Sequence, residues 1–175
     1  MVRAATPDDI GLLAGIEVAA GERFREIGMD GVADDSPPPR ALYAEAQRRG
    51  HLWVATVDGT VVGYAWAVDL EGQPHLEQIS VVPEMGGRGI GVALVDRVAV
   101  WAAEVGGTAL TLSTFRDVPW NAPWYERLGF VTVERPDDEP RWRGVRRHEV
   151  EAGLDVDARV IMRLVLPAPT PPADA

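Results

Sequence analysis

The stretch that decides the fold is residues 79–95, ISVVPEMGGRGIGVALV. It starts as an apolar strand, breaks at Pro83, passes four glycines between positions 86 and 91, and continues as an apolar helix. Such a loop points successive backbone N–H groups into one concavity at a helix N-terminus, where phosphate oxygens bind. The stretch therefore predicts a phosphate site in an α/β fold, and a glycine-rich loop with only a structural role is the alternative.

Two common phosphate-binding patterns do not fit these glycines. The dinucleotide fingerprint G-x-G-x-x-G requires a third glycine at position 92 or 94, where the chain has Val92 and Leu94. The ATP-binding P-loop requires a lysine, whereas all 17 residues counted as Lys or Arg are arginine. The loop therefore indicates a different phosphate-containing ligand.

Turn signals and periodicity on either side of this stretch predict one α/β domain over residues 1–166. The expected strands are 3–5, 51–57, 60–68, 75–82, 108–115, 130–133 and 159–166, with a hairpin at Asp58-Gly59. The expected helices are 6–24 (N-cap Thr6), 42–49, 90–104 and 120–128, and the second half of 141–153. We expect a turn-rich loop at 28–39, a chain break at Gln73-Pro74 and a disordered Pro-rich tail at 167–175.

The composition narrows the function. The 175 residues carry a net charge of −10, which argues against nucleic acid as a partner and suits a cationic substrate. The absence of lysine and cysteine excludes Schiff-base lysines, thiol nucleophiles and thiolate metal sites. The three histidines lack the spacing of a helical zinc pair, so we expect no metal. No apolar run is long enough for a membrane span, which predicts a cytoplasmic protein without a membrane partner.

Two motifs resemble those of the GCN5-related N-acetyltransferases (GNAT). In that family a strand leads through Val-x-Pro-x into Arg/Gln-x-x-Gly-x-Gly/Ala and a helix. Here Val81-Val82-Pro83-Glu84 precedes Gly86-Gly87-Arg88-Gly89-Ile90-Gly91, with glycine at position 86 where the family usually has Gln or Arg. Downstream, Asn121-Ala-Pro-Trp-Tyr125-Glu-Arg-Leu-Gly129-Phe130 resembles the family's Asn…A…L-Y-E-x-x-G-F segment, with the asparagine closer to the tyrosine than usual. Covering residues 2–166, the resemblance implies a single-domain fold with a mixed, mostly antiparallel sheet flanked by helices.

The resemblance implies acetyl-CoA as co-substrate. Ile79, Ser80 and Val81 would offer backbone groups to the pantetheine arm, and the Val81 N–H would stabilise the oxyanion. Asn121 is expected to contact the cofactor as well. The pyrophosphate would lie against the loop and helix start, at Gly86, Gly87, Arg88, Gly89, Ile90, Gly91 and Val92. For the Arg88 side chain, solvation is the alternative to a phosphate contact.

Acetyl transfer to an amine also needs an acid for the leaving thiolate and a base for the amine. Tyr125 matches the family's general acid, because a phenol of pKa about 10 and a thiol of about 8.5 are close enough for proton transfer. A tyrosine packed in the core is the alternative. Glu77, two residues before Ile79, is the candidate base, with a surface carboxylate as the alternative. His75 is a reserve base and Ser113 a reserve relay.

The acceptor is expected to contact the first helix and the loop after it, together with aromatic walls whose indole faces favour cations. For any one tryptophan, core packing is the alternative. The candidate acceptor-binding residues are Phe24, Met29, Trp53, Trp66 and Trp120, with Glu22, Arg25 and Trp124 beside them. We expect acetyl transfer to a small-molecule amine by direct attack in a ternary complex. The resemblance is also compatible with a homodimer, because members of the family often form dimers. The alternatives are a protein or peptide N-acetyltransferase and a non-catalytic acyl-CoA-binding regulatory module.

Overall fold

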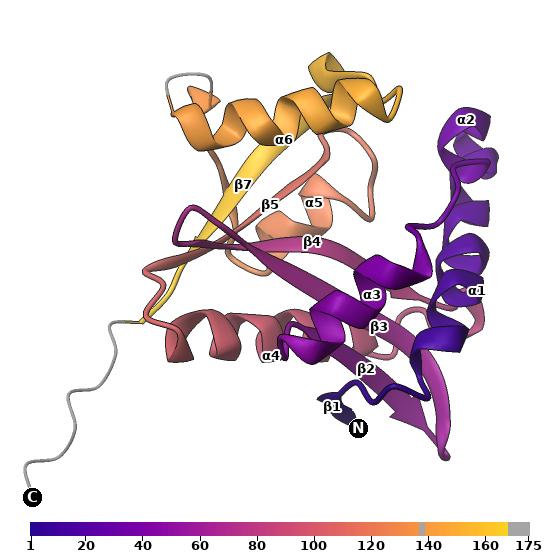
Figure 1. Cartoon of the computed structure of the whole chain (residues 1–175). Coiled ribbons are helices and arrows are strands. Elements are labelled where there is room, and N and C mark those ends of the chain that lie inside the picture. The colour runs from indigo at the N-terminus through magenta and orange to yellow at the C-terminus, as the bar shows by residue number, and fades with distance from the viewer. Residues whose placement is uncertain (137–138, 168–175) are drawn as a thin grey trace, which may run out of the picture. The chain divides into compact units, whose positions relative to one another are not determined.

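The computed structural model describes residues 1–136 and 139–167 (Figure 1). The contacts within this part divide into two compact units. Unit 1 contains residues 1–68 and 77–98, and unit 2 contains residues 69–76 and the described residues from 99 onward. The chain passes between the units within two strands and one helix, so each unit is described by itself.

Unit 1 contains most of the N-terminal half of the chain. Its elements are β1 (Val2–Ala4), α1 (Ile10–Gly21), η1 (Glu22–Ile27), α2 (Asp30–Ala33), α3 (Arg40–Arg48), β2 (Leu52–Val57), most of β3 (Thr60–Leu70), the second half of β4 (Gln73–Val81), η2 (Pro83–Met85) and the first part of α4 (Ile90–Glu104).

The sheet of unit 1 is antiparallel from β1 through β2 to β3, with Val2 opposite Ala55 and Leu52 opposite Trp66. Asp58 and Gly59 join β2 to β3 with φ values of 49° and 80°. Two successive positive φ angles are typical of a two-residue hairpin whose twist matches that of the strands. The predicted hairpin is therefore confirmed.

Helices α1 and α3 bury their apolar faces against β2 and β3. The fully buried side chains of this core include Leu13, Tyr43, Leu52, Val54 and Tyr64. Burial of these side chains is the main stabilising term of the unit, at about 25 cal/mol for each Å² of apolar surface removed from water. The same core fixes how α1 lies along the sheet.

Unit 2 also combines strands and helices. Its elements are the start of β4, the end of α4, β5 (Ala109–Phe115), α5 (Ala122–Arg127), β6 (Val131–Thr132), α6 (Pro140–Glu151), η4 (Val156–Ala158) and β7 (Arg159–Val165). β5 pairs antiparallel with β7 along its whole length, from Ala109 opposite Val165 to Phe115 opposite Arg159.

In unit 2, β4 and β5 pair in parallel, with His75 opposite Thr111 and Leu76 opposite Leu112. Hydrogen-bonded neighbours follow the order β1-β2-β3-β4-β5-β7-β6. The predicted α/β class, with a mixed, mostly antiparallel sheet and flanking helices, is confirmed. The predicted domain boundaries stay a prediction.

The start of the first helix differs from the prediction. α1 begins at Ile10, because Thr6 does not cap it. Instead the Asp9 carboxylate accepts hydrogen bonds from the Thr6 backbone N–H (2.7 Å) and hydroxyl (2.8 Å), so residues 6–9 form a turn. Arg3 also donates two hydrogen bonds to Asp9, of 2.7 and 2.9 Å. The acidic side chain is therefore used by the turn before the helix.

Three further segments differ from the prediction. β4 includes Gln73 and Pro74, because a proline near the start of a strand needs no ladder N–H. The loop at 28–39 contains the short helix α2, and α6 is helical from Pro140 rather than only in its second half. Of the predicted disordered tail, residues 168–175 lie outside the described residues.

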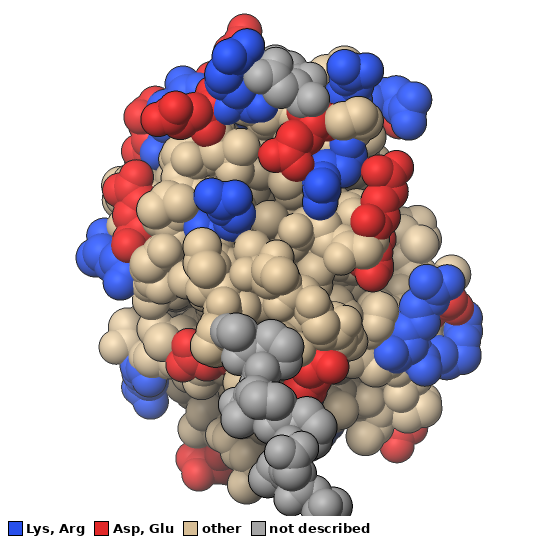
Figure 2. All heavy atoms as spheres, turned by 90° about the vertical axis from the view of Figure 1, so that its left-hand side faces the viewer, with Lys and Arg blue, Asp and Glu red and all other residues tan. Residues whose placement is uncertain are grey.

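Charge on the protein surface is mixed in sign. On the face in Figure 2, basic and acidic side chains lie near one another around an uncharged centre, and no basic stripe crosses the part drawn in colour. No helix within residues 1–136 and 139–167 is both long and apolar enough to cross a membrane.

Candidate functional site

The glycine-rich loop of unit 1 connects the end of β4 to α4. The turn η2 brings the Gly86 N–H to the Pro83 carbonyl at 2.9 Å, and α4 begins at Ile90. Gly87 and Gly89 have φ angles of 72° and 77°. These are left-handed conformations that side chains with a Cβ rarely adopt, so the loop requires glycine at both positions.

The backbone donors of this loop have no partner. The first helical hydrogen bond of α4 runs from the Ala93 N–H to the Gly89 carbonyl at 3.0 Å. Within the described part of the chain, none of the N–H groups of residues 87–92 donates to a carbonyl or side chain. Six consecutive free donors at the N-terminus of a helix form a strong anion-binding arrangement, because the helix dipole adds to them.

The loop is open to solvent and borders a hollow. Gly87, Arg88 and Gly89 are exposed. A pocket of about 220 Å³ is lined by Arg88, Gly89, Ile90 and Ala93 together with residues of β1 and β2 (Met1, Val2, Ala55, Thr56, Val57). An anionic ligand can therefore approach the loop without any rearrangement of unit 1.

The second half of β4 is the edge strand of unit 1 taken by itself. A Cβ on Gly63 of β3 would lie 2.8 Å from the Ser80 carbonyl oxygen, so glycine permits β3 to approach β4 closely. The Val82 N–H donates to Val62 of β3 at 2.9 Å. Consecutive residues of a strand point their N–H groups to opposite sides, so the Val81 N–H points away from β3.

Tyr125 of unit 2 lies in α5 with 6% of its surface exposed. Its ring packs edge-on against Trp124 and Phe130, with centroid distances of 4.8 and 5.4 Å. Its hydroxyl has no hydrogen-bond partner among the described residues. Burial raises the pKa of Tyr125 above the ordinary value of 10, and the positive charge of Arg159 opposes this in part. The phenol therefore stays protonated at neutral pH, and the same burial makes it a weaker acid than a free tyrosine.

Asn121 is the N-cap residue of α5, but its side chain makes no cap hydrogen bond to the helix. Its amide nitrogen donates to the Thr114 hydroxyl at 2.7 Å, but its Oδ1 atom is buried with no hydrogen-bond partner in the described chain. An unpaired buried acceptor costs about 1–3 kcal/mol, which a ligand N–H would recover. Trp120, just before it, is half-buried.

The candidate bases differ in their surroundings. Glu77 is exposed on β4. His75 is buried, donates through Nδ1 to the Thr111 hydroxyl at 2.9 Å, and has its pKa lowered to about 4 by burial. Ser113 donates to the buried Glu149 carboxylate. His75 and Ser113 are thus engaged in the packing of unit 2.

Of the residues predicted to bind the acceptor, the two tryptophans of β2 and β3 lie in the core, and the others are partly exposed. Trp53 is 1% exposed, with the Arg97 guanidinium 5.5 Å from its ring centroid, which matches the core-packing alternative. Trp66 is 9% exposed and meets Tyr43 edge-on at 5.9 Å. Phe24 and Met29 are half-buried and are brought together by a hydrogen bond from the Met29 N–H to the Phe24 carbonyl at 2.9 Å.

Two polar clusters were not predicted from the sequence. In unit 1, Glu17 of α1 accepts hydrogen bonds from Tyr43, Tyr64 and Gln78. In unit 2, Glu149 accepts from Ser113, Arg146 and Arg159. The partners of Glu17 lie 26, 47 and 61 residues away along the chain, so no local motif indicates the cluster.

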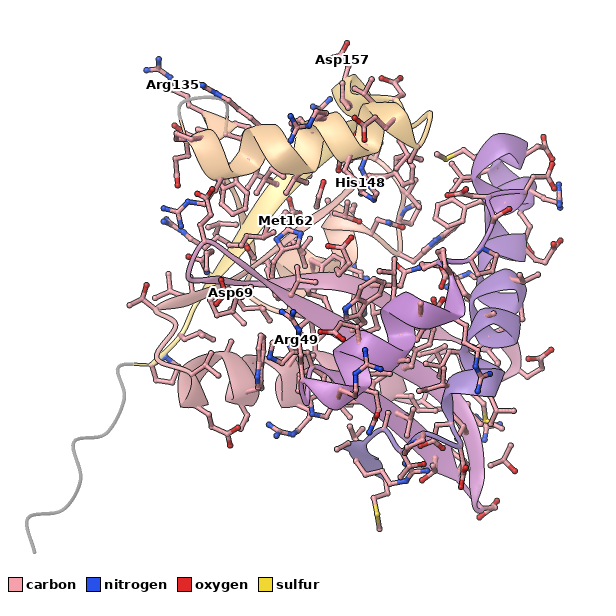
Figure 3. The ribbon with its side chains drawn as sticks, in the orientation of Figure 1. Arg49, Asp69, Arg135, His148, Asp157 and Met162 are labelled. Carbon is pink, nitrogen blue, oxygen red and sulfur yellow. The ribbon has the colours of Figure 1, made fainter. Side chains whose placement is uncertain are left out.

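The histidines of the described chain do not form a metal site. His75 lies within β4, whereas the exposed His148 lies on α6 (Figure 3). Within the described ranges, no three His, Asp or Glu side chains form a group that could hold a metal ion.

Comparison with known proteins agrees with this geometry. The model of the acetyltransferase (GNAT) family matches residues 18–130, which include the β4 strand, the glycine-rich loop and Tyr125. The chain belongs to this family.

Solved structures share the fold at low sequence identity. A Mycobacterium tuberculosis protein in complex with CoA, Rv2747, is 22% identical, with a TM-score of 0.69 over 95% of this chain and 99% of that one. The Escherichia coli ribosomal-protein-S18-alanine N-acetyltransferase is 18% identical, with a TM-score of 0.64 over 100% and 99% of the two chains. The Neisseria gonorrhoeae N-acetylglutamate synthase, with coenzyme A and N-acetyl-glutamate, is 18% identical, with a TM-score of 0.70 over 95% of this chain and 35% of that one.

Proposed function

We propose that the protein transfers the acetyl group of acetyl-CoA to a primary amine of a small molecule, by direct attack in a ternary complex. The observation that carries this is the row of free N–H groups at residues 87–92, on a loop that matches the family's pattern. Bound acetyl-CoA would supply an activated thioester and, through its pyrophosphate, the anion that this loop fits.

The residues present fit the acetyl donor in both units. In unit 1 the loop donors at residues 87–92 are available, and in unit 2 the unpaired Oδ1 of Asn121 can accept an N–H from a pantetheine amide. Gly86 places no side chain at the loop, where the family usually has Gln or Arg. Because backbone groups make most of the anion site, we expect this glycine to weaken binding only modestly.

Three residues have separate roles in the proposed reaction. The Val81 N–H stabilises negative charge on the thioester carbonyl oxygen while the amine nitrogen attacks the carbonyl carbon. Tyr125 gives its phenolic proton to the sulfur as the carbon–sulfur bond breaks, so that a thiol leaves. Glu77, exposed to water, accepts the proton that the amine loses, directly or through a water molecule.

Titration calorimetry with acetyl-CoA, followed by thiol release against a panel of amines, tests this function. We expect binding and amine-dependent release of thiol. Binding without release from any amine would favour the acyl-CoA-binding regulatory module, for which the departure at Gly86 leaves room. No binding would overturn the proposal and leave only the fold in common with the family.

The E. coli neighbour, whose name describes acetylation of a ribosomal-protein alanine, favours a protein or peptide amine as the second candidate acceptor. Including a short peptide with a free N-terminus in the panel separates the two classes. A homodimer and a cytoplasmic location stay predictions.

A further inference from the structure

Three carboxylates within residues 1–136 and 139–167 accept several side-chain hydrogen bonds and are matched with arginine. Asp9, Glu45 and Glu149 each accept hydrogen bonds from at least one arginine. Glu17 forms no ion pair with any residue of the described chain, and all its donors are neutral. Glu17 therefore carries a negative charge that the described protein does not balance.

The donors hold Glu17 in one position and leave one acceptor position of its carboxylate unused. Tyr43 donates to Oε2 at 2.6 Å, Tyr64 donates to the same oxygen, and the Gln78 amide donates to Oε1 at 2.8 Å. A carboxylate has about four acceptor positions, so Oε1 can accept one further hydrogen bond. Glu17 is half-buried, whereas Tyr43 and Tyr64 are 1% and 0% exposed.

The two tyrosines beside Glu17 are neutral hydrogen-bond donors to it. Burial, together with the neighbouring carboxylate, raises the pKa of Tyr43 and of Tyr64 well above 10, so both hydroxyls stay protonated. The two tyrosine rings meet edge-on at 5.7 Å, and Trp66 meets Tyr43 at 5.9 Å. The carboxylate thus lies beside a packed aromatic cluster.

A structural role alone does not explain a charged residue here. Removing an ion from water is costly, and neutral donors recover only part of that cost. The helix that carries Glu17 also runs directly into η1, where Phe24 lies in the region expected to contact the acceptor.

We propose that Glu17 binds the positively charged group of the amine acceptor, which makes the acceptor a cationic amine rather than an anionic amino acid. The inference rests on the proposed function. Oε1 accepts a hydrogen bond from the acceptor's ammonium, and such charge-assisted bonds are about twice as strong as neutral ones.

This role is separate from that of the proposed base. Successive side chains of a strand point to opposite faces, so Glu77 points away from the face on which its neighbour Gln78 meets Glu17. Glu17 then determines acceptor affinity, whereas Glu77 acts on the proton. With an active acceptor we expect Glu17→Gln to raise KM and Glu77→Gln to lower kcat.

Titration of the protein with CoA is the first step of the test and concerns the proposed function alone. Putrescine, L-alanine amide and L-glutamate are then titrated, whether or not CoA binds, into wild type, Glu17→Gln and the control Glu26→Gln. Glu26 is an exposed acid of η1 in the same unit, so its variant makes the same change in net charge. Tyr64→Phe is included because it removes one donor to Glu17 and keeps the charge.

We expect wild type and Glu26→Gln to bind the two cations at least about tenfold more tightly than glutamate, and Glu17→Gln to lose about tenfold in cation affinity alone. Tyr64→Phe should keep the preference for cations even if it lowers the Tm. The proposal is overturned if Glu17→Gln binds the cations as wild type does. It is equally overturned if wild type shows no preference for them, or if the affinity follows the Tm across all variants.

Discussion

At the scale of single residues, Tyr125 offers the sharpest test of the chemistry. Replacing it by Phe keeps the ring against Trp124 and Phe130 and removes only the hydroxyl. Loss of a general acid lowers a rate by about 100-fold or more, so we expect kcat to fall by that factor while the Kd for acetyl-CoA stays within about twofold. Stopped-time thiol assays and calorimetry measure the two quantities. Unchanged kcat would exclude Tyr125 as the acid.

The direction of the Tyr125 pKa adds a pH dependence. Since burial raises that pKa above 10, the phenol does not ionise between pH 8 and about 10, and its loss of a proton cannot reduce kcat there. If the kcat of the wild type declines at any pH below about 10, we therefore expect the same decline in Tyr125→Phe. A decline near pH 9 in wild type alone would show that the hydroxyl is more acidic than its surroundings imply.

His75 makes stability depend on pH in a defined window. Its folded pKa of about 4 lies below the ordinary value of 6.5, so the unfolded chain binds the proton more readily. Stability is complete above pH 6.5 and falls as the pH drops toward 4, by roughly 3 kcal/mol in all for a shift of this size. The free energy of unfolding, measured with urea, should therefore be lower at pH 5 than at pH 7.

Two variants separate this effect from other titrations. His75→Gln should flatten the difference in stability between pH 7 and pH 5. His148→Gln, on the exposed surface of α6 in the same unit, should leave it as in wild type. Equal pH dependence in all three proteins would assign the effect to groups other than His75.

At the scale of elements, the glycine-rich loop depends on backbone conformation. An added Cβ at Gly87 or Gly89 would meet nothing within 4 Å, so Ala at either position acts only through its positive φ. That strain costs about 1–2 kcal/mol, and the loop can relieve it by moving its N–H groups out of line. We expect Gly87→Ala and Gly89→Ala to weaken acetyl-CoA binding by about tenfold.

The matched control is Gly15→Ala within α1 of the same unit. Its Cβ also meets nothing within 4 Å, but Gly15 has ordinary helical geometry. We expect unchanged acetyl-CoA affinity and a gain in stability of about 0.5–1 kcal/mol, because Ala favours the helix. Equal affinity in all three variants would show that the loop conformation does not hold the ligand.

Elements with a strong local pattern could be predicted from the sequence, and those set by distant contacts could not. The α4 bounds and the Asp58-Gly59 hairpin follow from periodicity and turn chemistry. The predicted start of α1 was wrong because Arg3 and Thr6 both donate hydrogen bonds to Asp9, which holds residues 6–9 in a turn. β4 extends through Pro74, whose carbonyl accepts a hydrogen bond from Thr111 at 3.0 Å.

The candidate site shows the same division. The loop at residues 86–92 and the Tyr125 segment lie within short motifs, so the sequence indicated both. The environment of Glu17 joins residues from α1, α3, β3 and β4, and only folding brings those neutral donors to one carboxylate. That Trp53 is fully buried likewise depends on the packing of unit 1 rather than on its neighbours in the sequence.

At the scale of the whole molecule, the absence of lysine determines what the protein can do to itself. Its 17 arginines stay protonated at neutral pH and are poor nucleophiles, so the chain as given has one primary amine, at Met1. That amine donates to the Thr56 carbonyl at 2.7 Å but lies on an 89% exposed residue. Incubation with acetyl-CoA should therefore add at most one acetyl group.

Intact-mass spectrometry of the enzyme and of a lysine-rich reporter protein, incubated together with acetyl-CoA, tests this prediction and also the class of acceptor. One acetyl group or none on the chain, with none on the reporter, is the result expected of a small-amine acetyltransferase. Acetylated lysines on the reporter would instead favour the protein-acceptor alternative, and the signal would be unambiguous because the enzyme contributes no acetyl-lysine of its own. Two or more acetyl groups on the enzyme would require acetylated hydroxyls or guanidinium groups, and the argument from composition would then be wrong.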